Sequence, residues 1–175
     1  MKLHVHVTYE DYVRFNIFHA FHSKTSKRAI LLSRCIPAIV CCIWYVLDPP
    51  IGMPIGFWLR MIGLQAPFCI AYFLLYPKLH KWLIRRNVRK VKKEGKLPYH
   101  EDADLEFGDD TFIETTDHSA TTIQYADILS INETADAIYL MHGAISAFII
   151  PLRDLGDQKD ALLALLREKC PHIAQ

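Results

Sequence analysis

The chain has 175 residues, of which 51% are hydrophobic and 22% charged, and a formal net charge of +1. This length accommodates one ordinary globular domain, or a smaller domain together with membrane segments. The charge is unevenly distributed, because residues 29–76 contain only Arg34, Asp48 and Arg60 whereas residues 77–118 are densely charged. If the protein were soluble, its apolar segments would form two helices that are apolar on all sides. The rest of the chain is too short to cover them. The composition therefore argues against a fully soluble fold.

Residues 1–28 are expected to form a strand and an amphipathic helix on the cytoplasmic side. In residues 2–7 the apolar side chains alternate with His4 and His6, which is the period of a strand with one buried face. Thr8 has the character of a helix N-cap, and Asp11 three residues later completes a weak capping box. The segment has neither the basic start nor the cleavage site of a signal peptide, so the first apolar run is expected to stay in the protein.

Two apolar segments, residues 29–47 and residues 55–76, are each long enough to cross the hydrocarbon core of a bilayer as a helix. The connection between them, residues 48–54, is rich in proline and contains no Lys or Arg. So short a connection predicts an antiparallel hairpin. Basic residues precede the first segment and follow the second. The positive-inside rule therefore places both termini in the cytoplasm and the turn outside.

Each apolar segment contains one arginine, and both arginines are candidate contacts within the membrane. Arg34 and Arg60 each lie about five residues into a segment, where a charge at the centre of the bilayer would cost about 3 kcal/mol or more. Both are close enough to a helix end to extend the guanidinium towards the headgroups. This interpretation is favoured over an ion or substrate pathway.

Residues 77–100 form a basic stem that is expected to continue the second helix into the cytoplasm until Gly95 and Pro98 stop it. Its cations can attract anionic lipid headgroups, at about 1 kcal/mol per charge near the surface, although the simpler interpretation is that they fix the topology. The stem lacks the set of stacking aromatic residues that a single-strand reader needs, so nucleic acid is not an expected partner. The stem residues taken as candidate membrane or partner contacts are Lys78, Lys81, Arg85, Arg86 and Arg89.

From residue 101 to the end, the apolar pattern changes to the period of strands. Short alternating or β-branched segments, bounded by turn residues, predict strands at 104–107, 111–116, 121–125, 128–133, 137–142 and 145–150. Such short connections imply an antiparallel meander. An amphipathic helix with Asp157 as its N-cap is expected to follow. With residues 2–7 added, this domain would contain seven strands and a closing helix.

The sequence contains none of the motifs that indicate a catalytic or cofactor site, such as a nucleophile elbow, a phosphate-binding glycine loop or a dinucleotide fingerprint. The pairs His4–His6 and His19–His22 have spacings that could contribute to a metal site, but ordinary surface histidines are the favoured interpretation. The acidic run 101–110 is interpreted as a solvated surface or as a counterpart to the basic stem, and the five cysteines as small apolar side chains. We therefore expect no enzyme activity, no cofactor and no metal.

Several short motifs resemble the YcxB-like family of small bacterial membrane proteins. They are the YEDY helix start at 9–12, the two closely spaced apolar segments, and the segments IQYADI at 123–128, ETADAIYL at 133–140 and IIPLR at 149–153. The resemblance extends over nearly the whole chain. It implies a C-terminal domain similar to pleckstrin-homology domains and a bacterial inner-membrane location. It implies no established activity, so it assigns no catalytic residue.

The expected fold is an α+β membrane protein, in which a transmembrane hairpin (29–76) interrupts a cytoplasmic antiparallel β-barrel or sheet with a C-terminal helix (101–175). The leading functional hypothesis is a non-catalytic, membrane-anchored module that binds a protein segment or a lipid headgroup. Two alternatives stay open: an immunity protein against a membrane-acting toxin, and a subunit of an oligomeric channel or transporter. The expected partners are the lipid bilayer with its anionic lipids, an unidentified protein, and further copies of the chain.

Overall fold

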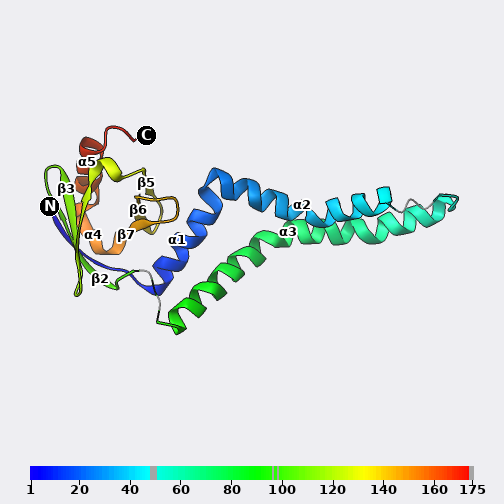
Figure 1. The fold of residues 1–175 in the computed structure, drawn as a ribbon, viewed down its shortest axis with the longest axis horizontal. Helices are drawn as coiled ribbons and strands as arrows, with labels where there is room; N and C mark the ends of the chain where they lie inside the picture. Colours follow the sequence, from blue (N-terminus) through cyan, green and yellow to red (C-terminus); the bar gives the residue numbers. More distant parts are fainter. Residues whose placement is uncertain (48–50, 96, 98, 174–175) are drawn as a thin grey trace. The chain divides into compact units, whose positions relative to one another are not determined.

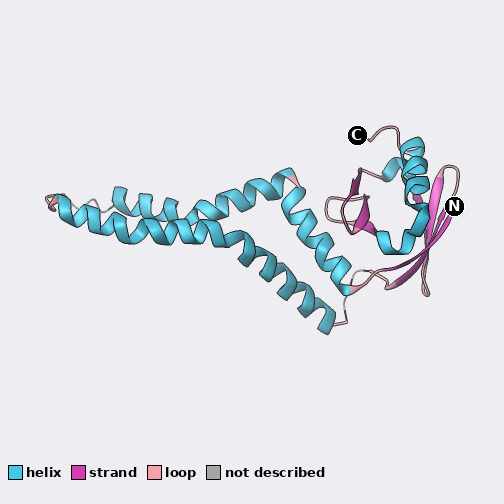
Figure 2. Ribbon diagram, turned by 180° about the vertical axis from the view of Figure 1, so that it is seen from behind, coloured by secondary structure: helices cyan, strands magenta, loops and turns pink. Residues whose placement is uncertain are grey.

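The computed structural model describes residues 1–47, 51–95, 97 and 99–173, and Figure 1 follows the chain through its elements. The chain divides into two compact units. We call residues 1–16 together with 90–175 the sheet unit, and residues 17–89 the hairpin unit. Within the described ranges the strands all belong to the sheet unit, and the hairpin unit is helical (Figure 2).

The hairpin unit is built mainly from two long helices, α2 (Lys24–Leu47) and α3 (Ile55–Lys93). The end of α1 (Tyr9–His22), which begins in the sheet unit, also belongs to it. Both α2 and α3 are long and apolar enough to cross a membrane, with mean hydropathies of 2.1 and 1.4 over their apolar stretches. By length and composition, these helices therefore match the two expected spans.

The helices α2 and α3 run antiparallel and contact each other at two levels. The Tyr45 hydroxyl donates a hydrogen bond to the side chain of Gln65 at 2.8 Å, and the Tyr45 ring stacks on Trp58. Further along the two helices, Nε of Arg34 donates a hydrogen bond to the backbone carbonyl of Phe73 at 3.0 Å. The expected antiparallel hairpin is therefore present.

The basic stem continues α3 without a break, as expected. Gly95 follows the helix with a φ of 66°, a left-handed conformation that favours glycine and ends the helix. Residues 48–50 of the expected turn, and Lys96 and Pro98 of the stem, lie outside the described residues.

The strands of the sheet unit form two antiparallel sheets, each in the order of a meander. The first sheet contains, in order, β1 (Lys2–His6), β2 (Asp102–Phe107), β3 (Thr111–Thr115) and β4 (Ala120–Gln124). The second contains β5 (Ser130–Glu133), β6 (Ala137–Met141) and β7 (Ala147–Pro151). All six strands expected between residues 101 and 151 are therefore present, with ends that differ by one or two residues.

The N-terminal strand pairs with the first strand after the hairpin. β1 runs antiparallel to β2, with Leu3 opposite Leu105 and His4 opposite Asp104. Leu3 and Leu105 are buried, whereas His4 and Asp104 are exposed. The alternation seen in residues 2–7 therefore does place one face of β1 in the core, and the expected pairing with the C-terminal sheet is present.

The core of the sheet unit lies between the two sheets and the C-terminal helix α5 (Lys159–Lys169). Leu162 and Leu166 of α5 are fully buried in a cluster that includes Leu105 from the first sheet and Ile138 from the second. The apolar stripe expected for this helix is therefore present, and it closes one side of the core.

The helix α5 begins in a different way from the one expected. A short helix α4 (Leu152–Leu155) and a 3₁₀ turn (Gly156–Gln158) lead from β7 directly into α5. The residue before α5 is Gln158, whose backbone is already helical and whose side chain makes no capping bond. The expectation that Asp157 is the N-cap was wrong, because the chain enters α5 from a preceding turn and not from an extended segment.

The two sheets do not close into a barrel, so of the expected barrel or sheet, the barrel is wrong and the antiparallel sheet is present. Within the described residues no ladder joins a strand of one sheet to a strand of the other. The short helix α4 contacts the outer edge of β1. There, the backbone N–H of His6 donates to Asp154 at 2.8 Å and Arg153 donates to the backbone carbonyl of His6. Side chains of α4 thus occupy the end of this edge, at His6.

Candidate functional site

An open cleft of about 320 Å³ lies within the sheet unit. Strands of both sheets line it, together with the first turns of α1 and the residues just before β2. Ligand pockets in proteins have volumes on the order of 300–1,000 Å³, so this cleft is large enough for a small ligand or a few residues of a peptide. Its apolar lining includes Val5, Val7, Phe15, Leu105, Phe148 and Ile149.

The free edge of β7 lies in this cleft, because Ala147, Phe148 and Ile149 all line it. In an antiparallel ladder, residues that bond to the neighbouring strand alternate with residues that point their N–H and C=O away from it. The bond from the N–H of His142 to the carbonyl of Ser146 sets this alternation for β6 and β7. Phe148 therefore bonds to β6, while Ala147 and Ile149 direct their backbone groups to the free edge. Within the described residues no strand pairs with that edge.

Glu114 is the carboxylate among the described residues that line the cleft. It follows Phe112 by two positions in β3, so the two share the inner face of the sheet, where Phe112 is fully buried. Burial raises the pKa of Glu114, and the charge of His100 acts in the opposite direction. Neither an ion pair nor a hydrogen bond is made by its carboxylate within the described part of the chain. Glu114 is thus a half-buried carboxylate available to a ligand.

The hydroxyl oxygen of Tyr99 is buried and has no hydrogen-bond partner among the described residues. Its ring lies 4.8 Å from the ring of Tyr12, measured between centroids, and both residues line the cleft. Burial raises the pKa of Tyr99 to about 12, so the hydroxyl is neutral and can donate a hydrogen bond. A buried polar group without a partner costs about 1–3 kcal/mol. A ligand that bonds to this hydroxyl would recover that free energy.

The chemistry of the cleft is acidic and aromatic, with no Lys or Arg among the described residues that line it. Besides Glu114 and the tyrosines, its titratable side chains are His100 and His142. Phosphate groups are usually bound by arginine or lysine, and the cleft offers neither. In the described part of the chain, no group of three or more His, Cys, Asp or Glu residues could hold a metal ion.

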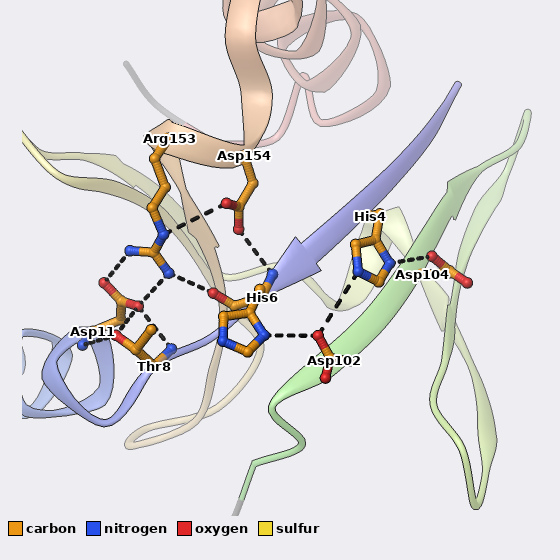
Figure 3. A network of polar contacts seen from close by, with 8 residues as sticks. All are labelled: His4, His6, Thr8, Asp11, Asp102, Asp104, Arg153 and Asp154. Carbon is orange, nitrogen blue, oxygen red and sulfur yellow. Dashed lines mark hydrogen bonds and ion pairs between the residues drawn. The ribbon is translucent and has the colours of Figure 1, made fainter.

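A polar network joins the start of α1 to α4 (Figure 3). Asp11 accepts hydrogen bonds from the two terminal nitrogens of Arg153, at 2.9 and 2.7 Å. The N–H of Thr8 donates to the same carboxylate at 2.8 Å, which confirms the expected capping box. Arg153 and Asp154 also bind the backbone of His6, as described above. The network therefore joins the end of β1, the beginning of α1 and the chain after β7.

Asp11 is buried, with an exposed fraction of only 2%, and yet its carboxylate is charged. Burial alone would raise its pKa, but the hydrogen bonds from Arg153 and Thr8 outweigh this effect and lower the pKa to about 2. The same pairing raises the pKa of Arg153. This ion pair is a structural link within the sheet unit, because both of its partners are already occupied.

Basic and acidic side chains also pair on the exposed outer face of β1 and β2. These cross-strand pairs are Lys2–Glu106 at 3.0 Å, His4–Asp104 at 2.8 Å and His6–Asp102 at 2.7 Å (the histidines in Figure 3). The hydrogen bond to Asp104 raises the pKa of His4. The two histidines that the sequence places on one face therefore each have a carboxylate partner.

The seven contact residues selected from the sequence all lie in the hairpin unit: Arg34, Arg60, Lys78, Lys81, Arg85, Arg86 and Arg89. The guanidinium of Arg34 lies 3.9 Å from the centroid of the Phe73 ring, in addition to its bond to the Phe73 carbonyl.

The stem residues Lys81 and Arg86 lie over the rings of Phe21 and Trp82, at 5.3 and 5.4 Å. Arg60 is exposed, as are Lys78 and Arg89. The described contacts thus place Arg34, Lys81 and Arg86 on three separate aromatic rings.

Sequence analysis did not select Glu114 or Tyr99. A signal for Glu114 was present, because alternation within the expected strand 111–116 puts it on the same face as Phe112. Tyr99 lies near the end of the stem, after α3 and before β2, where the sequence has no periodic pattern. Its burial depends on Tyr12, which the tertiary structure brings next to it.

Comparison with known families matches residues 107–166 to the YcxB-like protein family. The matched segment runs from the end of β2 into α5, so it contains β3 to β7, α4 and most of α5. The resemblance noted in the sequence is confirmed for this segment. No curated protein and no solved structure matches the chain.

Proposed function

We propose that this chain, which carries a YcxB-like domain at residues 107–166, is a non-catalytic, membrane-anchored binding protein. In this proposal α2 and α3 cross the bacterial inner membrane, both termini are cytoplasmic, and the sheet unit binds an extended protein segment. The observation that carries the proposal is the unpaired edge of β7 inside a cleft of about 320 Å³.

The length and the surface of the two long helices support the membrane anchor. The 24 residues of α2 span about 36 Å, which exceeds the roughly 30 Å of the hydrocarbon core. Large apolar side chains such as Val40, Leu64 and Ile70 are exposed along both helices. Soluble monomers rarely expose so much contiguous apolar surface. The basic end of α3 supports a cytoplasmic location for the stem, since cytoplasmic flanks carry an excess of Lys and Arg.

The cleft suits an extended segment because strand addition uses the groups that it leaves unpaired. In this binding mode, backbone hydrogen bonds at a sheet edge provide affinity, and pockets for alternate side chains provide specificity. Ala147 and Ile149 offer N–H and C=O groups, and Val5 and Leu105 provide an apolar wall. Pro151 comes next on the same edge and has no N–H, so it limits the pairing to a short stretch.

The cleft favours a protein segment over an anionic lipid headgroup. A headgroup phosphate would enter a space lined by Glu114 and by no described Lys or Arg. The cations that could bind anionic lipids are instead on the stem, among them Lys78 and Arg89. Lipid attraction is therefore assigned to the stem and protein binding to the cleft.

The order of elements supports a relation to pleckstrin-homology-like domains. Four strands in one sheet are followed by three in a second sheet and then by a helix. Because the sheets stay open, the proposed binding surface is the gap between them and not the mouth of a closed barrel.

The proposal can be tested by blocking strand addition at a single amide. Full-length protein in lipid nanodiscs would be screened against a display library of random short peptides. Binding of the enriched peptides would then be measured with two variants, Ala147→Pro and Ala147→Val. Proline removes an N–H that points away from β6, whereas valine keeps it. We expect about tenfold weaker binding to the proline variant and unchanged binding to the valine variant.

Thermal unfolding of both variants in detergent provides the control for folding. If no peptide is enriched, or if the folded proline variant binds as well as the unchanged protein does, strand addition at β7 is wrong.

A further inference from the structure

The cleft contains a carboxylate that the protein itself leaves unpaired. Glu114 lies on the inner face of β3, opposite Thr121 of β4, and both residues line the cleft. A carboxylate removed from water is destabilised unless it is protonated or meets a cation. The neighbouring titratable groups are His100, His142, Tyr12 and Tyr99, and none of them carries a permanent positive charge. A cation from outside the chain would therefore find an unoccupied counter-charge here.

Aromatic rings and a buried hydroxyl stand in the same cleft. The rings of Tyr12 and Tyr99 lie 4.8 Å apart, and the Tyr99 hydroxyl has no partner among the described residues. Ammonium and guanidinium groups are stabilised by aromatic faces, and they also form strong hydrogen bonds to carboxylates. The donor and acceptor pattern of the cleft thus matches a Lys or Arg side chain.

The edge of β7 determines what would carry that cation. A segment that pairs with Ala147 and Ile149 is extended, and its side chains alternate between the two sides of the strand. Side chains on the inward side face the inner surface of the first sheet, where Glu114 is flanked by apolar residues such as Leu105. The pattern that fits is therefore a basic residue with apolar residues two positions before and after it.

We propose that the occupant of the cleft is an extended polypeptide whose central inward side chain is Lys or Arg, held by Glu114. This inference rests on the proposed function, because it assumes strand addition at β7, and it adds the chemical class of the partner. The amine of an ethanolamine headgroup could also reach a carboxylate. It would leave the N–H and C=O groups of Ala147 and Ile149 unused, so the polypeptide is the source to which the proposal commits.

The test uses full-length protein in nanodiscs of phosphatidylcholine and the same random peptide library. Three proteins are compared: the unchanged chain, Glu114→Gln, and the matched control Glu106→Gln. Glu106 is on the exposed outer face of β2, where it pairs with Lys2. For each enriched peptide, affinity is measured for the parent sequence and for a copy in which the basic residue is replaced by glutamine.

We expect the enriched peptides to share a Lys or Arg with apolar residues at the second position on either side. The replacement by glutamine should weaken binding to the unchanged protein about tenfold or more, consistent with a hydrogen bond to a charged group. For the Glu114→Gln protein, the parent peptide and its glutamine copy should bind with nearly equal affinity. For the Glu106→Gln protein, the parent peptide should still bind more tightly than the copy.

The outcomes separate this inference from the proposed function. Peptides that bind without a basic residue, and that lose affinity in Ala147→Pro, would overturn the role of Glu114 and leave strand addition standing. A library without enriched peptides would overturn both. If nanodiscs with phosphatidylethanolamine abolish peptide binding and Glu114→Gln restores it, the cleft holds a lipid amine and the polypeptide assignment is wrong.

Discussion

The sheet unit and the hairpin unit use apolar residues in opposite ways. In the sheet unit they alternate with polar residues and are buried, as Leu105 and Phe112 show with exposed fractions of 1% and 0%. In the hairpin unit they follow one another in long runs and are exposed, as Val46 and Leu64 show at 78% and 76%. The residue types are similar and the period differs. The period of the apolar residues therefore decides whether they build a core or stay exposed along a helix.

The two units also differ in how they hold an arginine. In the sheet unit, Arg153 forms a double hydrogen bond with the buried carboxylate of Asp11. In the hairpin unit, Arg34 has no carboxylate in the contacts described, and it binds the carbonyl and the ring of Phe73. Arg34 is thus paired with a backbone acceptor and an aromatic face instead of a carboxylate.

The largest expected effect is the loss of membrane integration when a charge is placed on the hairpin surface. Val40→Asp introduces a carboxylate at an exposed position of α2, which in a bilayer costs about 3 kcal/mol. We expect the variant to leave the carbonate-resistant membrane fraction. Ile113→Asp is the matched change, because Ile113 is also apolar and exposed but lies on the outer face of β3. Equal membrane retention of the two variants would contradict the proposed difference between the units.

The next largest effect concerns the ion pair between Asp11 and Arg153 in the sheet unit. Asp11→Asn removes the charge from a buried side chain whose partner, Arg153, is 46% exposed, and the loss of such a charged hydrogen bond costs about 2 kcal/mol. We expect the apparent Tm of the full-length protein in detergent to fall by roughly 6 °C. The control is Arg14→Gln, which removes an exposed pair with Asp136 and should cost less than about 1 kcal/mol. A Tm change of the same size in both variants would show that burial does not decide the strength of these pairs.

The same ion pair predicts a dependence of stability on pH. The pKa of Asp11 in the folded chain is about 2, below its ordinary value in an unfolded chain of about 3.9. Stability from this group is therefore fully present above about pH 4 and is lost as the pH falls through about 2. The Tm difference between the unchanged protein and Asp11→Asn should shrink over this range. A difference that stays constant from pH 5 to pH 2 would be inconsistent with an ionised Asp11.

The smallest expected effect separates the two arginines of the hairpin. Arg34→Leu removes the contacts with Phe73 and should destabilise the pairing of α2 and α3 by about 1 kcal/mol. Arg60→Leu removes an exposed side chain and should have less effect. The measurement is the midpoint of denaturant unfolding for each variant in the same detergent. A larger loss for Arg60→Leu would point to a role for Arg60 in contact with lipid or with another chain.

Much of the architecture could be predicted because its signals are local. The lengths of two apolar runs and the short connection between them predict the hairpin, and the alternation in residues 2–7 predicts a strand with one buried face. The spacing of Thr8 and Asp11 predicts the capping box. Each of these signals is contained in a few neighbouring residues, where backbone geometry alone relates sequence to structure.

The sequence by itself determined which segments are helices and strands and which faces are apolar. The tertiary structure decided which distant residues meet. Asp11 and Arg153 are 142 positions apart and could not be paired from any period. Glu114 and Tyr99 become parts of one cleft because strands of both sheets, the start of α1 and the residues before β2 come together around it. The physical reason is that periodicity reports which side of an element is buried, whereas the choice of partner depends on how the chain closes over long distances.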